Sequence, residues 1–151
     1  MTGADFIATA SRWAANPAAS EAAFRSAVSR AYYGAFHLGM DLLNLLGLDI
    51  PKGANCHGLV RTFLLESGHA QAVEAGRLLK DLHADRIKAD YRLDNRDAAT
   101  HAAALLAVET ATDTMSLIGT CSKEPDRTQI KTGIENYKRK LEAGLSKGPR
   151  S

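Results

Sequence analysis

Apolar residues recur every three or four positions through most of this chain, and no stretch alternates apolar and polar positions over β-branched residues. Such spacing is typical of amphipathic helices. Alanine is abundant and proline is scarce, which favours helix over strand. The pattern therefore predicts an all-α fold. Boundary residues of the Ser, Thr, Gly and Pro type predict six helices. Their approximate ranges are 2–15, 20–46, 55–66, 70–91, 97–121 and 126–145, and the second helix has an alternative start at residue 17.

The predicted helix that ends at residue 46 has two distinct faces. With Phe24 at the centre of a helical wheel, a set of apolar residues falls within about 40° of it and predicts a core stripe. These residues are Val28, Ala31, Ala35, Leu38, Leu42 and Leu46. The opposite, polar face carries Arg30, Tyr33, His37, Asp41 and Asn44.

Arg30 and His37 are the main candidate pair on this polar face. They lie almost two helical turns apart, so they point the same way at a separation of about 10 Å. A guanidinium suits phosphate through its forked donors, and an imidazole exchanges a proton near neutral pH. Together they supply the groups for metal-free attack on a phosphodiester. Tyr33 beside them suits either a protein interface or a nucleotide site.

The composition is that of an ordinary globular protein, with 45% hydrophobic and 24% charged residues in a chain of 151. This length fits one domain with a single core. No apolar run approaches the roughly 20 residues that span a bilayer, and no secretory signal is evident, so we expect a cytoplasmic protein with no membrane segment. Cys56 and Cys121 are expected to be reduced thiols, although their number also permits one disulfide.

Residues 122–151 differ in charge from the rest of the chain. Residues 1–121 carry 11 Lys and Arg against 13 Asp and Glu, whereas residues 122–151 carry 8 against 4. The globular part is therefore not a broad cationic coat for nucleic acid. The spacing of Ile130, Ile134 and Tyr137 opposite Lys138-Arg139-Lys140 predicts an appended amphipathic helix. It either packs on its own bundle or a second copy, or docks to a partner protein or a phosphate backbone.

Three segments together resemble a known family. They are Ser29-Arg30-Ala31-Tyr32-Tyr33 followed by Phe36-His37, then Cys56-His57-Gly58-Leu59-Val60 with Phe63, then Arg86 followed by Ala89-Asp90-Tyr91. Their order and spacing resemble the HEPN domain family (higher eukaryotes and prokaryotes nucleotide-binding). The similar branch has a Ser-Arg-Ala-Tyr-Tyr-x-x-Phe-His helix and a later Arg-x-x-Ala-Asp-Tyr element. The resemblance covers about residues 3–121.

The resemblance implies an antiparallel bundle of four to five helices over residues 1–121, commonly a homodimer with a composite site. It implies a metal-independent endoribonuclease of toxin–antitoxin or defence type, with RNA or a nucleotide as ligand. Its partner would be a nucleotidyltransferase-type antitoxin. Arg30 would hold the scissile phosphate, and His37 would act as general base on the 2′-OH or as general acid. No cofactor or metal is expected, since no metal-binding spacing is present.

Two positions depart from the active pattern of that family. Ala31 stands where active members usually carry a polar residue, and Gly39 stands where a tyrosine in some toxins receives a nucleotide. Gly39 means that control by nucleotide transfer cannot work through this residue. Ala31, together with the aromatic Tyr33 on the polar face, favours the alternative of a non-catalytic HEPN nucleotide-binding or protein-interaction module.

The remaining candidates support the pair. Tyr33 and Asp41 share its face, while Arg86, Asp90 and Tyr91 lie on one side of a later helix. Arg86 and Asp90 are expected to form an ion pair that stabilises the helix, and the alternative is that this side of the helix contacts RNA. His57 is interpreted as a local cap, with cleft lining as the alternative, and three other histidines as surface residues: His69, His83 and His101.

Overall fold

The structure is a computed structural model that describes residues 1–146. This part of the chain is helical and contains no strand, which confirms the all-α prediction. None of its helices is long and apolar enough to cross a membrane. The elements are α1 (Gly3–Ala14), α2 (Glu21–Leu45), α3 (Cys56–Leu65), α4 (Ala70–Tyr91), the 3-10 helix η1 (Arg96–Ala99), α5 (His101–Cys121) and α6 (Asp126–Ser146).

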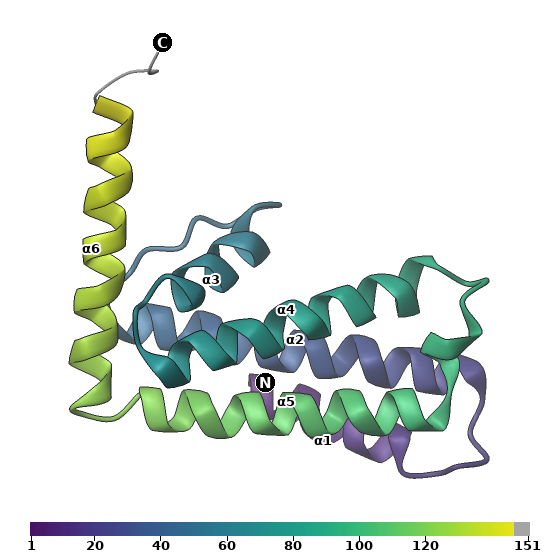
Figure 1. Ribbon diagram of the computed structural model, residues 1–151. Helices are drawn as coiled ribbons and strands as arrows, with labels where there is room; N and C mark the ends of the chain where they lie inside the picture. Colours follow the sequence, from purple (N-terminus) through teal and green to yellow (C-terminus); the bar gives the residue numbers. More distant parts are fainter. Residues whose placement is uncertain (147–151) are drawn as a thin grey trace.

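Four helices form the body of the molecule. In Figure 1, α1, α2, α4 and α5 lie along one another, with α2 antiparallel to α1 and α4, and α5 antiparallel to α4. The shorter α3 lies obliquely over one end of α2 and α4, and α6 stands across that same end. The side chains in the following sections belong mostly to α2 and the three helices packed around it.

Local sequence sets the helix boundaries. The Ser20 hydroxyl accepts a 3.1 Å bond from the Ala23 amide, so α2 begins after Ser20 rather than at Pro17. Gly47 follows the helix with φ of +77°, a conformation that favours glycine. The predicted helix over 97–121 is wrong at its start, because residues 96–99 form a 3-10 turn and the Thr100 side chain caps α5.

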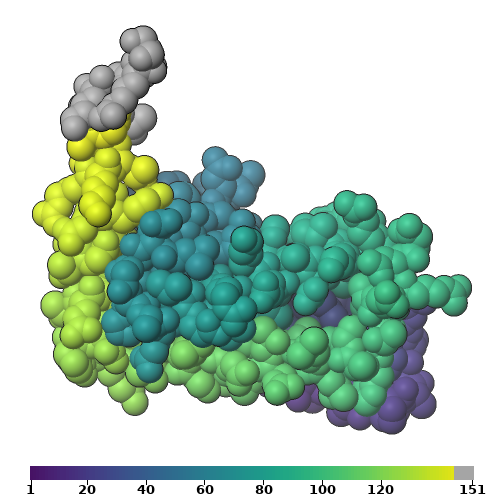
Figure 2. All heavy atoms as spheres, in the orientation of Figure 1, coloured from purple at the N-terminus to yellow at the C-terminus, as the bar shows by residue number. Residues whose placement is uncertain are grey.

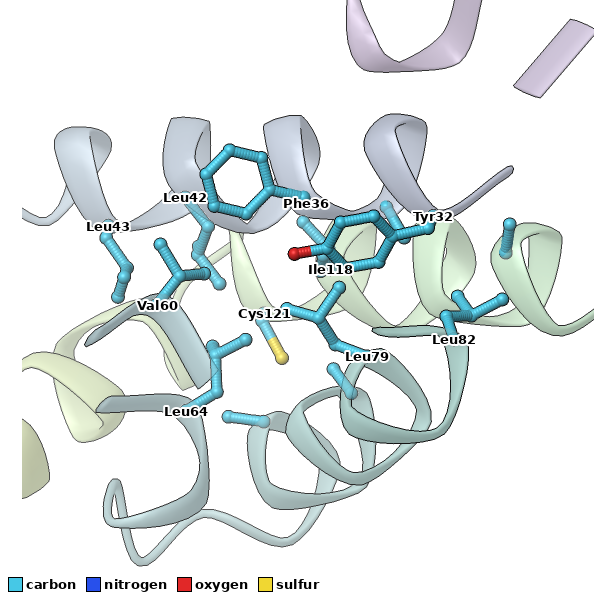
Figure 3. Close-up of a cluster of buried hydrophobic side chains, with 14 of the residues drawn as sticks. Tyr32, Phe36, Leu42, Leu43, Val60, Leu64, Leu79, Leu82, Ile118 and Cys121 are labelled. Atoms are coloured by element: carbon cyan, nitrogen blue, oxygen red, sulfur yellow. The ribbon is translucent and has the colours of Figure 1, made fainter. Parts of the chain in front are cut away.

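The core lies between α2 and the helices that surround it. The predicted stripe of α2 is buried except for Leu38, which is partly exposed. Figure 3 shows Tyr32 and Leu42 of α2 facing Leu79 of α4 and Ile118 of α5, and Phe36 belongs to the same cluster. Cys121 lies in this cluster as a free thiol, and burial raises its pKa to about 11. Cys56 is also free, so the pair forms no disulfide.

The first half of α6 packs on its own chain. Ile130 and Ile134 are fully buried in the main core cluster. The α6 backbone approaches so closely that a Cβ on Gly133 would lie 1.7 Å from the Ser67 carbonyl oxygen. Leu141, farther along, is 47% exposed, and Figure 2 shows α6 extending past the body of the molecule. The interpretation that α6 packs on its own bundle is therefore confirmed for this first half.

Candidate functional site

Arg30 and His37 lie on the exposed face of α2, as the helical wheel predicts. Arg30 is exposed and His37 is partly exposed. The Arg30 guanidinium lies 5.3 Å from the centre of the Phe6 ring, and the His37 and Phe6 ring centres are also 5.3 Å apart. Within residues 1–146, Arg30 forms no hydrogen bond or ion pair. The Phe6 ring therefore contacts both the unpaired guanidinium of Arg30 and the imidazole of His37.

Two glycines bring Phe6 to this position. A Cβ on Gly34 of α2 would lie 2.5 Å from Ile7 Cγ1 and 2.8 Å from the Gly3 carbonyl oxygen. A Cβ on Gly3 would likewise lie 2.6 Å from the Gly34 carbonyl oxygen. The backbones of α1 and α2 can approach this closely only because both positions lack a side chain.

A second cluster joins α2 to α4 beside this pair. Arg86 donates a 2.7 Å hydrogen bond to the Tyr33 hydroxyl and lies over the rings of Tyr33 and Tyr91, 5.2 Å from each ring centre. Its Nε lies 2.9 Å from Asp90 Oδ2 as an ion pair, although the N–H is not aligned for a hydrogen bond. Asp90 also accepts a 3.0 Å bond from Ser29. The structure therefore brings Tyr33, Arg86, Asp90 and Tyr91 together.

Arg25 fixes the end of α4 that carries this cluster. Its side chain is buried and pairs with Glu21 at 2.9 Å. The remaining guanidinium donors go to backbone carbonyl oxygens at 2.8–3.3 Å, which belong to Lys88, Ala89, Arg92, Leu93 and Asn95. One side chain thus satisfies carbonyls that the helix end leaves free.

His57 is not a local cap, so that interpretation of the sequence is wrong. Its Nδ1 lies 2.6 Å from the Tyr32 hydroxyl, and its ring stacks on Phe36 with centres 4.1 Å apart. Asn55 occupies the N-cap position of α3 and makes no side-chain capping bond. Burial raises the pKa of Tyr32 to about 12, so this hydroxyl stays protonated at neutral pH.

His57 instead lines a cleft that is open to solvent, which is the alternative given by the sequence analysis. Arg61 and His83 line the same cleft. Burial lowers the pKa of His57, and the charges of Arg86, Arg61 and His37 lower it further. Burial and the charge of Arg61 likewise lower the pKa of His83, whose ring meets Tyr32 at 5.3 Å. Sequence spacing did not indicate Arg61 or His83, since only the folded chain brings α3 against α4.

Two further histidines are not the surface residues that the sequence suggested. His69 is largely buried, caps α4 through Nδ1, and lies 3.1 Å from Asp126 through Nε2. His101 packs on Phe24, and its Nε2 is buried without a hydrogen-bond partner. Within residues 1–146, no group of three or more His, Cys, Asp or Glu side chains is arranged to hold a metal ion.

Three further positions of α2 were singled out by the sequence: Asp41, Ala31 and Gly39. Asp41 is exposed one turn beyond His37 and has no hydrogen bond or ion pair within the described chain. Ala31 is fully buried in the core. Gly39 is buried too, and a Cβ there would lie 3.0 Å from Val60 Cγ1. Neither position can present a polar side chain to a ligand beside Arg30 or His37.

Comparison of this chain with protein families, curated proteins and solved structures gave no match. The site is therefore described by its own geometry and by the three sequence segments that resemble the HEPN family.

Proposed function

We propose that this protein is a metal-independent endoribonuclease of the HEPN type that works as a homodimer. The main support for the proposal is the placement of Arg30 and His37 against the same Phe6 ring, beside the contact between α1 and α2 and accessible to solvent. A guanidinium and an imidazole on the same side of a helix supply charge stabilisation and proton transfer without a metal.

The proposed reaction is transesterification within RNA. Neutral His37 takes the proton of a ribose 2′-OH, and the 2′-oxygen forms a bond to the adjacent phosphorus. The bond from phosphorus to the 5′-oxygen breaks, and protonated His37 of a second copy gives that oxygen its proton. Arg30 neutralises the charge on the pentavalent phosphorus. The products are a 2′,3′-cyclic phosphate and a free 5′-OH.

The cluster around Arg86 supports the same function from α4. Its guanidinium is paired with Asp90 and donates to the Tyr33 hydroxyl, while Tyr91 is 66% exposed and offers a ring for stacking. Single-stranded RNA is bound by such combinations of aromatic faces and arginines. An antitoxin partner would act by covering this face, because Gly39 has no side-chain hydroxyl to receive a nucleotide.

Incubation of labelled single-stranded RNA with the protein in EDTA tests the proposal. We expect cleavage of RNA, and none of DNA or of 2′-O-methyl RNA of the same sequence, because both lack the attacking hydroxyl. Analytical ultracentrifugation of the same sample should give a dimer. Cleavage of DNA at a similar rate, or a requirement for Mg²⁺, would contradict the mechanism.

A non-catalytic nucleotide-binding module is the second candidate. The burial of Ala31 favours it, since no polar side chain follows Arg30 to assist the chemistry. This candidate predicts that the wild-type protein binds RNA or nucleotide but leaves it intact, and that Arg30→Ala weakens the binding.

A further inference from the structure

The cleft between the start of α3 and the middle of α4 has the chemistry of an anion site. Its volume is about 530 Å³, and its polar lining consists of Asn55, His57, Arg61 and His83. None of its lining residues is a carboxylate. A cleft whose charged side chain is an arginine attracts anions.

Arg61 is the unpaired cation of this cleft. Its side chain is partly buried, yet it forms no ion pair or hydrogen bond with any residue of the described chain. By contrast, Arg25, Arg77 and Arg86 each pair with a carboxylate. A guanidinium that is partly desolvated and lacks a protein partner is suited to the forked binding of a phosphate.

His57 adds a neutral donor. The Tyr32 hydroxyl is buried, and its one hydrogen-bond partner within residues 1–146 is His57 Nδ1. The hydroxyl must donate to Nδ1, because otherwise its own proton would have no acceptor. The proton of the neutral imidazole then sits on Nε2. Within the described chain this atom makes no hydrogen bond and is not fully buried, and its residue lines the cleft.

The cleft adjoins the Arg30–His37 face. The Phe36 ring contacts both imidazoles, with its centre 4.1 Å from that of His57 and 5.3 Å from that of His37. The charge of His37 also acts on His57. The cleft and His37 are therefore separated by a single aromatic ring, so a strand bound at His37 lies next to the cleft.

We propose that this cleft binds the phosphate of a nucleotide next to the scissile one, with Arg61 on the phosphate and the His57 Nε2–H and Asn55 amide as further donors. The identity of the ligand as an RNA strand rests on the proposed function. The cleft extends the site beyond Arg30 and His37. It would bind the RNA strand on one side of the scissile bond.

Binding of a fluorescent 2′-O-methyl oligonucleotide to the full chain tests this proposal without any cleavage. Arg61→Ala should weaken binding about tenfold and lower the slope of log affinity against log salt by about 0.7, the value for one lost phosphate contact. Arg77→Ala is the matched control, since Arg77 is an exposed arginine paired on α4. Equal affinities of the two variants would overturn the proposal.

A steric variant makes the test independent of charge. Gly58 lines the cleft, and a Cβ there would meet no atom within 4 Å, so Gly58→Leu should fold normally and fill the cleft. Gly119→Leu is its control, at a helical glycine with equally open surroundings on α5. We expect weaker binding for the first variant only. Unchanged binding would place the strand elsewhere.

The two proposals fail in distinguishable ways. If the wild-type protein binds the oligonucleotide through Arg61 but does not cut RNA, the nuclease proposal fails, and the cleft stands as a phosphate site for an RNA strand that is bound and not cut. If it cuts RNA and Arg61→Ala binds normally, the cleft proposal alone fails. Absence of oligonucleotide binding by the wild type overturns both. Binding of AMP as tight as that of the oligonucleotide would assign the cleft to a free nucleotide and overturn the RNA assignment.

Discussion

The guanidinium of Arg30 and the imidazole of His37 lie against the same ring, each 5.3 Å from the centre of Phe6. The ring contacts both side chains, so we expect it to help position them relative to each other. Positioning of this kind matters because a displacement of about 1 Å can cost a hundredfold in rate.

Phe6→Ala should therefore slow RNA cleavage by tenfold or more, while the chain stays folded. The initial rate of cleavage in EDTA checks this, together with a circular dichroism spectrum. Trp13→Ala is the matched control, because Trp13 is a partly exposed aromatic of the same helix outside the site. Equal rates for the wild type and Phe6→Ala would mean that the ring does not position the pair.

Gly34→Ala should destabilise the protein by about 1–3 kcal/mol, because the new methyl group would overlap α1. The displacement of α1 should carry Phe6 away from Arg30 and His37. Urea denaturation measures the first effect and the cleavage rate the second. Gly119→Ala, where the methyl group meets no atom, should instead be neutral or stabilising by up to about 1 kcal/mol. Similar stability of the two variants would refute the close-approach argument.

Arg25→Ala should lower the free energy of unfolding by about 3 kcal/mol, since the helix end loses a buried cation that serves five carbonyl oxygens. The measurement is the urea midpoint at constant slope. Arg77→Ala removes an exposed ion pair, which water screens, and should leave the urea midpoint nearly unchanged. A loss below about 1 kcal/mol for Arg25→Ala would contradict the role given to this side chain.

The stability of the protein should fall as the pH drops below about 6.5, partly because of His57. The folded chain lowers the pKa of this imidazole through burial and through Arg86, Arg61 and His37. The unfolded chain then binds the proton first, near the ordinary pKa of about 6.5. The contribution of neutral His57 to the free energy of unfolding is therefore complete above about pH 6.5. It is lost as the pH falls from that value through the lower pKa of the folded state.

His57→Gln provides the comparison, because an amide oxygen can still accept the Tyr32 hydroxyl but does not titrate. Unfolding free energies between about pH 5 and 7.5 should depend less on pH in this variant than in the wild type. Parallel curves would show that His57 is free to take a proton in the folded protein.

The helices and their core stripe could be predicted because they follow from local rules. The cap at Ser20 and the glycine at Gly47 set the ends of α2, and the 3.6-residue period placed Val28 inside and Arg30 outside. The 3-10 turn at Arg96–Ala99 was missed, because the apolar pattern continues smoothly from it into α5.

The parts of the site that involve several helices could not be predicted. No spacing within α2 indicates that Phe6 of α1 lies between Arg30 and His37, and none links Arg61 of α3 to His83 of α4. Arg25 looked like any helical arginine, since its partners come from a segment more than 60 residues later. Such contacts depend on the close packing of helices, which glycine positions permit but do not specify.

The most direct test of the account is the rate at which the wild type and His37→Ala produce 2′,3′-cyclic phosphate ends from single-stranded RNA in EDTA. Arg30→Ala belongs in the same series, with Arg92→Ala as an exposed arginine control. We predict that the wild type and the control produce these ends, and that the His37 and Arg30 variants do so at least about a hundredfold more slowly. Equal rates for the wild type and His37→Ala would show that His37 takes no part in cleavage.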